Sequence, residues 1–205
     1  LIDSLGVQDG IPSSTGAFLA RTADGDILFD TGNGGPEGHL TDRLDSLGLA
    51  PADIDYIYIT HFHGDHIGGM MEGDSAVFTN AQVYVPKAEY DAWMAMPADR
   101  KSQVVRTMDA YRDRLHMVDP RLELLAGSDV VLPGGVVPYH APGHTPGHTV
   151  YYLGQAGLMI VGDLMHGAAL QLEHPEINAN FDMDGAVAAA TRAKVLDCVR
   201  TNGLV

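Results

Sequence analysis

Alternating apolar and polar residues recur in short runs along this chain and predict β-strands. The runs are rich in β-branched and aromatic residues and are bounded by Gly, Pro or Asp, as is typical of strands. They lie at 15–20, 26–30, 54–59 and 77–86 in the first half and at 122–125, 130–132, 136–140, 149–153 and 158–161 in the second. Because 23–26 is a turn sequence, the first two runs are expected to form a hairpin.

Other stretches carry apolar residues at the spacing of amphipathic helices. These helices are expected at 40–47, 87–96, 100–117 and 184–202. Gly48 fits the end of the first helix, and Asp184 fits the N-cap of the last. Strands and helices are mixed in both halves of the chain, so the predicted fold class is α/β.

Candidate metal ligands follow directly after the strand predicted at 54–59. His61 and His63 are two positions apart and therefore project to the same side of an extended segment, while Asp65 and His66 lie where the next helix would begin. Imidazole and carboxylate groups suit zinc and related divalent ions, and the single Cys198 excludes a thiolate site. The spacing suits two adjacent metal ions, each bound by part of the cluster.

The second half offers further candidates at the ends of predicted strands. The 143–148 loop contains His144 and His148, and its Pro and Gly residues fix its shape, so that a side chain there can be aimed rigidly at a metal. Asp163 follows Gly162 just past the strand at 158–161, where a carboxylate can reach a site built by the other loops.

Composition narrows the functional classes further. The 205 residues, 45% of them hydrophobic, can bury a sizeable core, and we expect one domain over 1–205. A net charge of −15 disfavours nucleic-acid binding and favours a small neutral or modestly charged substrate. No apolar run approaches the roughly 18 residues that span a bilayer, which predicts a soluble protein without a membrane partner. The sequence leaves open a homodimer and the compartment, whether cytoplasmic, periplasmic or secreted.

The motif His61-x-His63-x-Asp65-His66, followed by the 143–148 loop and by Asp163, resembles the metallo-β-lactamase-fold hydrolase superfamily. The segments at 58–61 and 170–175 are most similar to its methyl parathion hydrolase-like branch. The resemblance implies a four-layer αββα sandwich with the site along one edge of the sheets. It also implies two divalent ions, with zinc expected first and iron, manganese or cobalt as alternatives.

The same resemblance implies a role for each ligand. One metal is assigned to His61, His63 and His144, and the second to Asp65 and His66, with Asp163 bridging the two ions. A water acidified by the metals would be the nucleophile, and Asp65 is a further candidate to orient it or to carry its proton.

Several neighbouring residues receive supporting roles from the resemblance. Asp30, a turn or cap residue by its sequence context, is expected to support the metal loops, as is His148. Trp93 is either part of a core stripe or an aromatic at the substrate pocket. His166, three residues after Asp163, either donates a hydrogen bond to the substrate carbonyl or has a structural role at the surface.

The expected function is hydrolysis of small ester-like substrates, either phosphotriesters or lactones. A glyoxalase II-like thioesterase and an iron-dependent sulfur dioxygenase are alternatives with overlapping metal motifs, and a non-catalytic metal-binding scaffold is a third. Relatives complete the second metal with a histidine after one more strand, and 203–205 reads as the start of such a strand. We therefore expect the chain to be truncated at its C-terminus and a final ligand to lie beyond Val205.

Overall fold

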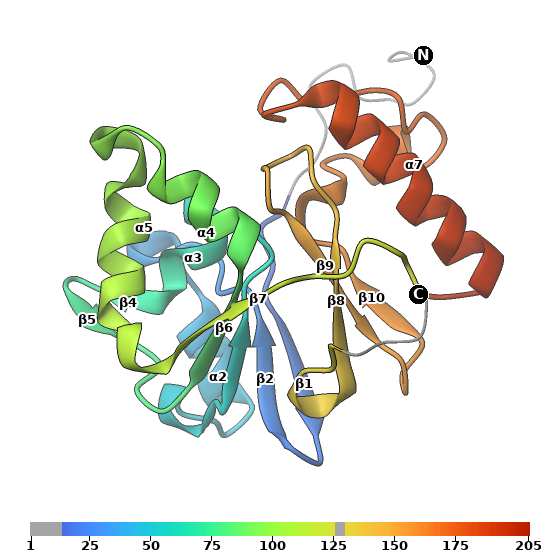
Figure 1. The fold of residues 1–205 in the computed structure, drawn as a ribbon. Helices are drawn as coiled ribbons and strands as arrows, with labels where there is room; N and C mark the ends of the chain where they lie inside the picture. Colours follow the sequence, from blue (N-terminus) through green and yellow to red (C-terminus); the bar gives the residue numbers. More distant parts are fainter. Residues whose placement is uncertain (1–13, 126–129) are drawn as a thin grey trace.

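Two β-sheets stand side by side at the centre of the molecule, with helices on their outer faces (Figure 1). The structure is a computed structural model that describes residues 14–125 and 130–205. The first sheet has the order β1-β2-β3-β6-β7, and the second has the order β10-β9-β8. The strands of the first sheet are β1 (Phe18–Thr22), β2 (Gly25–Phe29), β3 (Tyr56–Tyr58), β6 (Gln82–Pro86) and β7 (Leu115–Val118). Those of the second are β8 (Val136–His140), β9 (Thr149–Leu153) and β10 (Leu158–Ile160), and a separate small hairpin joins β4 (Met71–Glu72) to β5 (Ser75–Ala76).

Strand direction decides where the loops of the first sheet gather. The predicted hairpin is present, with β1 antiparallel to β2 and Phe18 opposite Phe29. The strands β2, β3, β6 and β7 are all parallel. Parallel strands bring their carboxyl ends to one edge of the sheet, where ligand sites of α/β folds form. The segments that follow β2 and β3 therefore lie together.

The helices fall into two groups. On the side of the first sheet lie α2 (Leu40–Ser46), α3 (Gly64–Ile67), α4 (Lys87–Met94) and α5 (Ala98–Ala110), whereas α6 (Ala168–Gln171) and α7 (Gly185–Asn202) lie on the side of the second (Figure 1). The predicted N-cap is present, since the Asp184 side chain accepts a hydrogen bond from the Val187 amide. Gly203, with φ of 63°, ends the helix in the left-handed conformation that glycine adopts without a steric cost.

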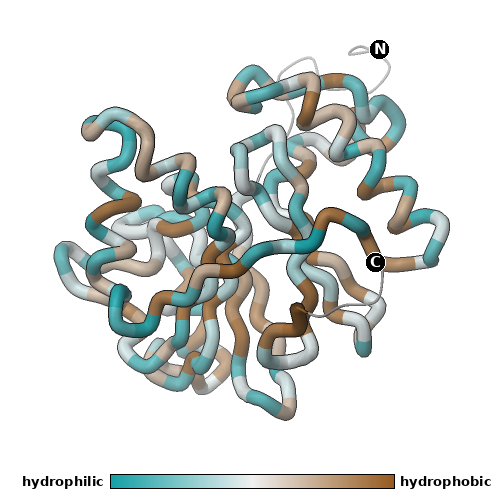
Figure 2. The backbone as a smooth tube through the Cα atoms, viewed as in Figure 1, coloured by the Kyte–Doolittle hydropathy of each residue, from teal (hydrophilic) through white to brown (hydrophobic). Residues whose placement is uncertain are grey.

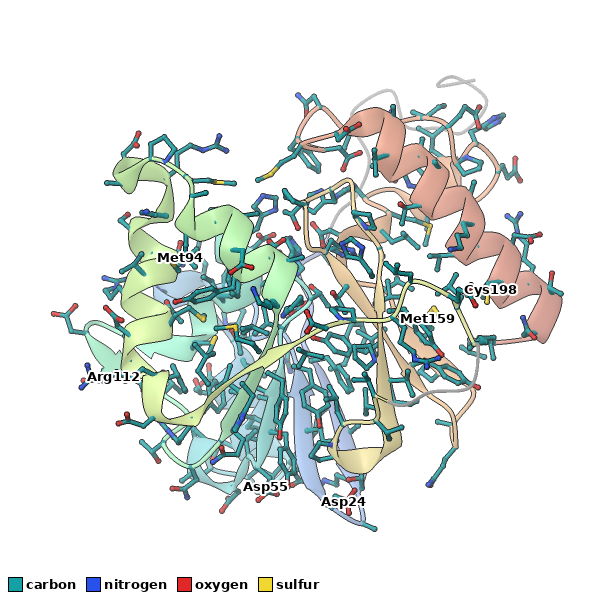
Figure 3. The ribbon with its side chains drawn as sticks, in the orientation of Figure 1. Asp24, Asp55, Met94, Arg112, Met159 and Cys198 are labelled. Carbon is teal, nitrogen blue, oxygen red and sulfur yellow. The ribbon has the colours of Figure 1, made fainter. Side chains whose placement is uncertain are left out.

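Three apolar clusters separate four layers. Leu28 and Ile57 pack outward against the helices α2 to α5. Ile27 and Tyr58, on the opposite face of the same strands, pack against residues of the second sheet. The outer face of the second sheet, including Met159, packs on α7, the helix that carries Cys198 (Figure 3). Hydrophobic segments are concentrated along the central strands and hydrophilic ones in the peripheral loops and turns (Figure 2). The expected αββα sandwich is confirmed.

Some expected elements were wrong. The helix expected at 100–117 ends at Ala110, and Leu115–Val118 is instead strand β7, because Val83 to Pro86 of β6 pair with it in parallel. The runs at 122–125 and 130–132 form no strand in the described part of the chain. Only isolated bridges occur near them, at Arg121 and at Leu132. Pairing partners rather than local apolar pattern decided these segments.

The backbone of Val205 pairs with the free edge of β10. Its amide donates to the Gly157 carbonyl over 3.0 Å, and its carbonyl accepts from the Met159 amide over 2.8 Å. These two bonds have the pattern of a parallel pair, but 203–204 close helix α7 and form no strand, so the strand start expected at 203–205 is limited to Val205. Within residues 14–125 and 130–205, no helix combines the length and apolar character that crossing a membrane requires.

Candidate metal centre

Hydrogen bonds between the sheets bring four loops together. The Thr149 amide at the start of β9 donates to the Thr60 carbonyl over 3.0 Å. The buried Tyr151 hydroxyl donates to the Ile59 carbonyl over 2.7 Å. Both bonds fasten the second sheet to the segment that precedes His61. The loops after β2, β3, β8 and β10 consequently converge on one edge of the sandwich.

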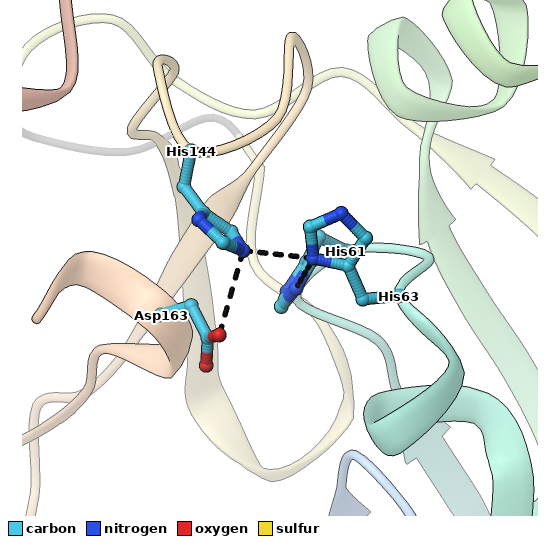
Figure 4. Close-up of side chains that lie close together, drawn as sticks. All are labelled: His61, His63, His144 and Asp163. Atoms are coloured by element: carbon cyan, nitrogen blue, oxygen red, sulfur yellow. Dashed lines mark hydrogen bonds and ion pairs between the residues drawn. The ribbon is translucent and has the colours of Figure 1, made fainter. Parts of the chain in front are cut away.

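Four side chains from three of these loops form a tight cluster (Figure 4). Nδ1 of His63 lies 3.1 Å from Nε2 of His61 and 2.8 Å from Nε2 of His144. Nε2 of His144 lies 3.4 Å from Oδ2 of Asp163. Ligand atoms bound tetrahedrally at about 2.0–2.1 Å from a zinc ion lie roughly 3.3 Å apart. The cluster therefore has the spacing and the donor atoms that a divalent ion requires.

A second group of side chains adjoins the first on the other side of Asp163. Oδ1 of Asp163 lies 3.0 Å from Nε2 of His66, and Oδ2 of Asp65 lies 3.9 Å from the same nitrogen. Nδ1 of His66 is bonded to Oδ2 of Asp30 over 2.7 Å. Asp30, at a left-handed φ of 57°, also accepts from the Thr60 amide and hydroxyl. This buried carboxylate orients His66 and fixes the start of the motif loop.

Burial favours the neutral form of most of the clustered imidazoles. Desolvation lowers the pKa of His61 well below its usual range, lowers that of His63 to about 4 and that of His148 to about 3. Burial also lowers the pKa of His144. Burial alone would raise the pKa of Asp163, but hydrogen bonds from His166 and His66 hold it well below its usual range. Neutral imidazoles beside an ionised carboxylate are the protonation states that bind a metal.

His66 behaves differently from the other histidines, and a pH optimum for the metal-free fold follows. Burial would lower its pKa, yet the carboxylates of Asp30 and Asp163 raise it to about 10. Its stabilising contribution is therefore complete below pH 6.5 and is lost as the pH rises towards 10. Those of His63 and His148, whose pKa values are lowered, are complete above pH 6.5 and are lost as the pH falls towards 4 and 3. We expect urea unfolding of the metal-free protein to give the highest stability near pH 6.5, and a steady increase from pH 5 to pH 9 would contradict this.

His166 lies beside the ligand cluster. Its Nε2 is 3.2 Å from Oδ2 of Asp163, and its ring makes an edge contact with Phe181 at 4.5 Å. Its Nδ1 is buried and has no hydrogen-bond partner among the described residues. The side chain is 17% exposed and faces a pocket of ≈ 880 Å³ beside the cluster. The walls of that pocket are polar at Asp65 and apolar at Phe18 and Phe181.

The other supporting residues divide between the site and the core. His148 lies against the cluster, where its Nε2 accepts from the Asp163 amide over 3.1 Å and its Nδ1 is bonded to the Ala141 carbonyl. Trp93 is 6% exposed within the first apolar cluster and is absent from the pocket wall, so the pocket role was wrong and the core role is confirmed. Its ring contacts the ring of His63 at 5.8 Å.

Sequence reasoning missed a buried chain of charged groups behind His144. Nδ1 of His144 is 2.9 Å from Oδ1 of Asp182, whose other oxygen is 3.4 Å from the Arg192 guanidinium. Arg192, fully buried on α7, also donates to the Leu164 carbonyl next to Asp163. Sequence reasoning also missed Glu89 of α4, whose carboxylate is fully buried. No spacing rule links these residues to the motifs, and only their burial and partners reveal them.

Comparison with known proteins agrees with this geometry. The sequence model of the metallo-beta-lactamase superfamily matches residues 11–203 of this chain. The structure of AidC, a dizinc quorum-quenching lactonase in complex with a product, is 29% identical with a TM-score of 0.76, over 88% of this chain and 67% of that one. The structure of the hydrolase AbOPH, in the beta lactamase superfamily, is 26% identical with a TM-score of 0.83, over 99% of this chain and 75% of that one.

The curated relatives are longer than the matched region. An N-acyl homoserine lactonase from Bacillus thuringiensis is 25% identical over 146 residues, which is 70% of this chain and 50% of that protein. The lactamase-like protein vrtG from Penicillium aethiopicum is 41% identical over 56 residues, 27% of this chain and 18% of that protein. The match to the family nonetheless extends over nearly all of the sequence and includes the whole ligand cluster. This chain therefore belongs to the metallo-beta-lactamase superfamily.

Proposed function

We propose that this chain is the catalytic domain of a dinuclear metal hydrolase that opens small lactones, and acyl-homoserine lactones are the first class to test. We further propose that residues 1–205 form one single domain. The observation that carries the proposal is the position of Asp163 between two groups of ligands. One of its oxygens lies 3.4 Å from Nε2 of His144, and the other lies 3.0 Å from Nε2 of His66. A carboxylate placed in this way can bridge two ions.

The proposed ligand sets follow the two groups. The first ion would be held by His61, His63 and His144, whose donor atoms share one small space with Asp163. The second would be held by His66 and Asp65 together with the same carboxylate. Zinc is the first candidate because the ligands are imidazole and carboxylate, and iron, manganese and cobalt remain alternatives.

Bound ions would supply Lewis acidity and a water acidified towards a pKa of about 7. The residues of the chain would do the rest. Asp65, whose side chain is 44% exposed and lines the pocket, would accept a proton from the attacking water. His166 lines the same pocket and would donate a hydrogen bond to the carbonyl of the substrate. Phe18, Met165 and Phe181 would pack against an acyl group and exclude water from it.

A lactone is favoured over a phosphotriester because AidC, a similar solved structure, and the similar protein from Bacillus thuringiensis are both named as lactonases. The likeness to the methyl parathion hydrolase-like branch keeps the phosphotriester as the second ester to test. A glyoxalase II-like thioesterase or an iron-dependent sulfur dioxygenase would use the same metal ligands, and these two enzymes are the next alternatives. A non-catalytic scaffold would bind metal without turning over any of these compounds.

The test combines metal analysis of the full-length protein with hydrolysis assays on an acyl-homoserine lactone, a phosphotriester and a thioester. We expect about two metal ions per chain and chelator-sensitive opening of the lactone. Iron with turnover of a sulfur compound would replace the proposal by the dioxygenase. Bound metal without turnover of any of the substrates would favour the scaffold.

A further inference from the structure

Glu89 is a carboxylate in an unusual place. It is the third residue of α4 and is fully buried in the layer of helices on the first sheet. No Lys or Arg pairs with it among the ion pairs of residues 14–125 and 130–205. A buried ionised group without a counter-ion is costly unless hydrogen bonds replace its hydration.

Hydrogen bonds from two different loops surround the carboxylate. Oε1 accepts from the Phe62 amide over 3.0 Å and from the Trp93 indole over 2.6 Å. Oε2 accepts from the Thr145 hydroxyl and from the Gly147 amide, each over 2.8 Å. All four donors are neutral, and together they occupy the acceptor sites that only an ionised carboxylate offers.

The two oxygens divide the two ligand loops between them. Phe62 lies between His61 and His63, and Thr145 directly follows His144. One carboxylate oxygen thus holds the loop from the first sheet, and the other holds the loop from the second. The fixed separation of the two oxygens sets how far apart the loops stand.

The backbone at Gly147 packs closely against the backbone of Glu89. A Cβ atom on Gly147 would lie 2.0 Å from the amide nitrogen of Glu89, so the 143–148 loop rests directly on the first turn of α4. Only glycine permits this approach. Trp93, which is bonded to the same carboxylate, presses against His63 through a ring contact at 5.8 Å. Glu89 therefore touches the surroundings of ligands in both loops without touching a ligand.

We propose that Glu89 is a positioning residue of the metal centre, a buried carboxylate that holds the loop of His61 and His63 at metal-binding distance from His144 before any ion arrives. The inference rests on the proposed function, because it concerns the same metal site. Pre-organised ligands bind a metal more tightly, since less conformational freedom is lost when the ion enters. A merely structural Glu89 would stabilise α4 and leave metal affinity unchanged.

The test compares Glu89→Gln with the wild-type protein and with Val104→Ala. Glutamine keeps the size of the side chain, but its amide nitrogen cannot accept, so one of the two loops loses its bonds. Val104 lies in α5 within the same apolar cluster as Trp93 and has no polar side-chain atom that could bond to Glu89 or to either loop, so its truncation controls for a general loss of stability. Zinc affinity is measured by competition with a chromophoric chelator, with the emission of Trp93, the single tryptophan, as a second signal.

We expect Glu89→Gln to weaken zinc binding by about 10- to 100-fold, the range found when groups that support metal ligands are changed. Val104→Ala should melt at a lower temperature and bind zinc as the wild type does. In the metal-free proteins, amide hydrogen exchange at Phe62 or Gly147 should be faster in Glu89→Gln and unchanged in Val104→Ala. Equal zinc affinity in Glu89→Gln and wild type would overturn the inference and leave the proposed function intact, whereas a wild-type protein without zinc affinity would overturn both.

A second pair of variants decides the matter if Glu89→Gln does not fold. Thr145→Val removes one donor to Oε2 with little change in volume, and Thr145→Ser keeps the hydroxyl. Weaker zinc binding in the valine variant with recovery in the serine variant would support the inference. Equal zinc affinity in Thr145→Val and Thr145→Ser would overturn the inference.

Discussion

Changing Asp163 to Asn should lower the proposed lactone hydrolysis by on the order of 10³-fold, because the side chain loses the oxygen that faces one of the two ligand groups. The two oxygens of Asp163 lie 3.4 Å from Nε2 of His144 and 3.0 Å from Nε2 of His66. An amide nitrogen has no free lone pair for a metal, so only one of these positions survives the substitution. The substitution also removes the negative charge that the surrounding histidines face. Metal content should fall to about one ion per chain, as read by elemental analysis.

Asp184→Asn is the matched control for this variant. It makes the same chemical change 21 positions further along the chain, at the exposed N-cap of α7. Asn is as good an N-cap as Asp, so the helix should keep its start. Full activity in the control and loss of activity in Asp163→Asn would tie the effect to the site. Wild-type turnover and metal content in Asp163→Asn would refute a bridging carboxylate.

Removal of the metals should lower the melting temperature by roughly 8 to 16 °C, given 2–4 °C per kcal/mol for a chain of this size. A ligand that binds only the folded state stabilises it by about 4 kcal/mol when its free concentration is about 1,000 times Kd. This stabilisation would come from the ligand cluster. His61 and His144 are almost completely buried beside other histidines, with exposures of 0% and 3%.

The measurement is a thermal scan with and without a strong chelator, followed by restoration with zinc or cobalt. Recovery of the original melting temperature after metal addition would show that the loss was not due to irreversible unfolding. The Asp163→Asn variant should lose less stability on chelation than the wild type, because it holds less metal to begin with. An unchanged melting temperature in the wild type would mean that the cluster contributes no metal-linked stability.

Substrate preference can be examined separately from metal binding, through the residues of the pocket wall. Phe181 is 55% exposed and lies against His166, so its contribution to acyl binding can be separated from that of the ligands. The proposed lactone and phosphotriester reactions would share the same ions and the same Asp163. What differs between them is the shape of the pocket wall, which selects the bond that is cleaved.

Local sequence patterns were sufficient to predict most of the secondary-structure elements and, with the family resemblance, the candidate ligands. The hairpin of β1 and β2, the strand before His61 and the N-cap at Asp184 depend on nearby residues, and local patterns predicted them. The family resemblance singled out His144, and its place at a strand end singled out Asp163; both lie in one cluster with His61.

The remaining features could not be predicted locally, because they depend on partners that are far apart along the chain. The segment Leu115–Val118 became a strand since the open edge of β6 lies beside it, a fact that no local pattern contains. Glu89 and Asp182 look like ordinary helix and loop acids in the sequence. They acquired their surroundings only when burial removed water and left distant amides, hydroxyls and imidazoles as their partners.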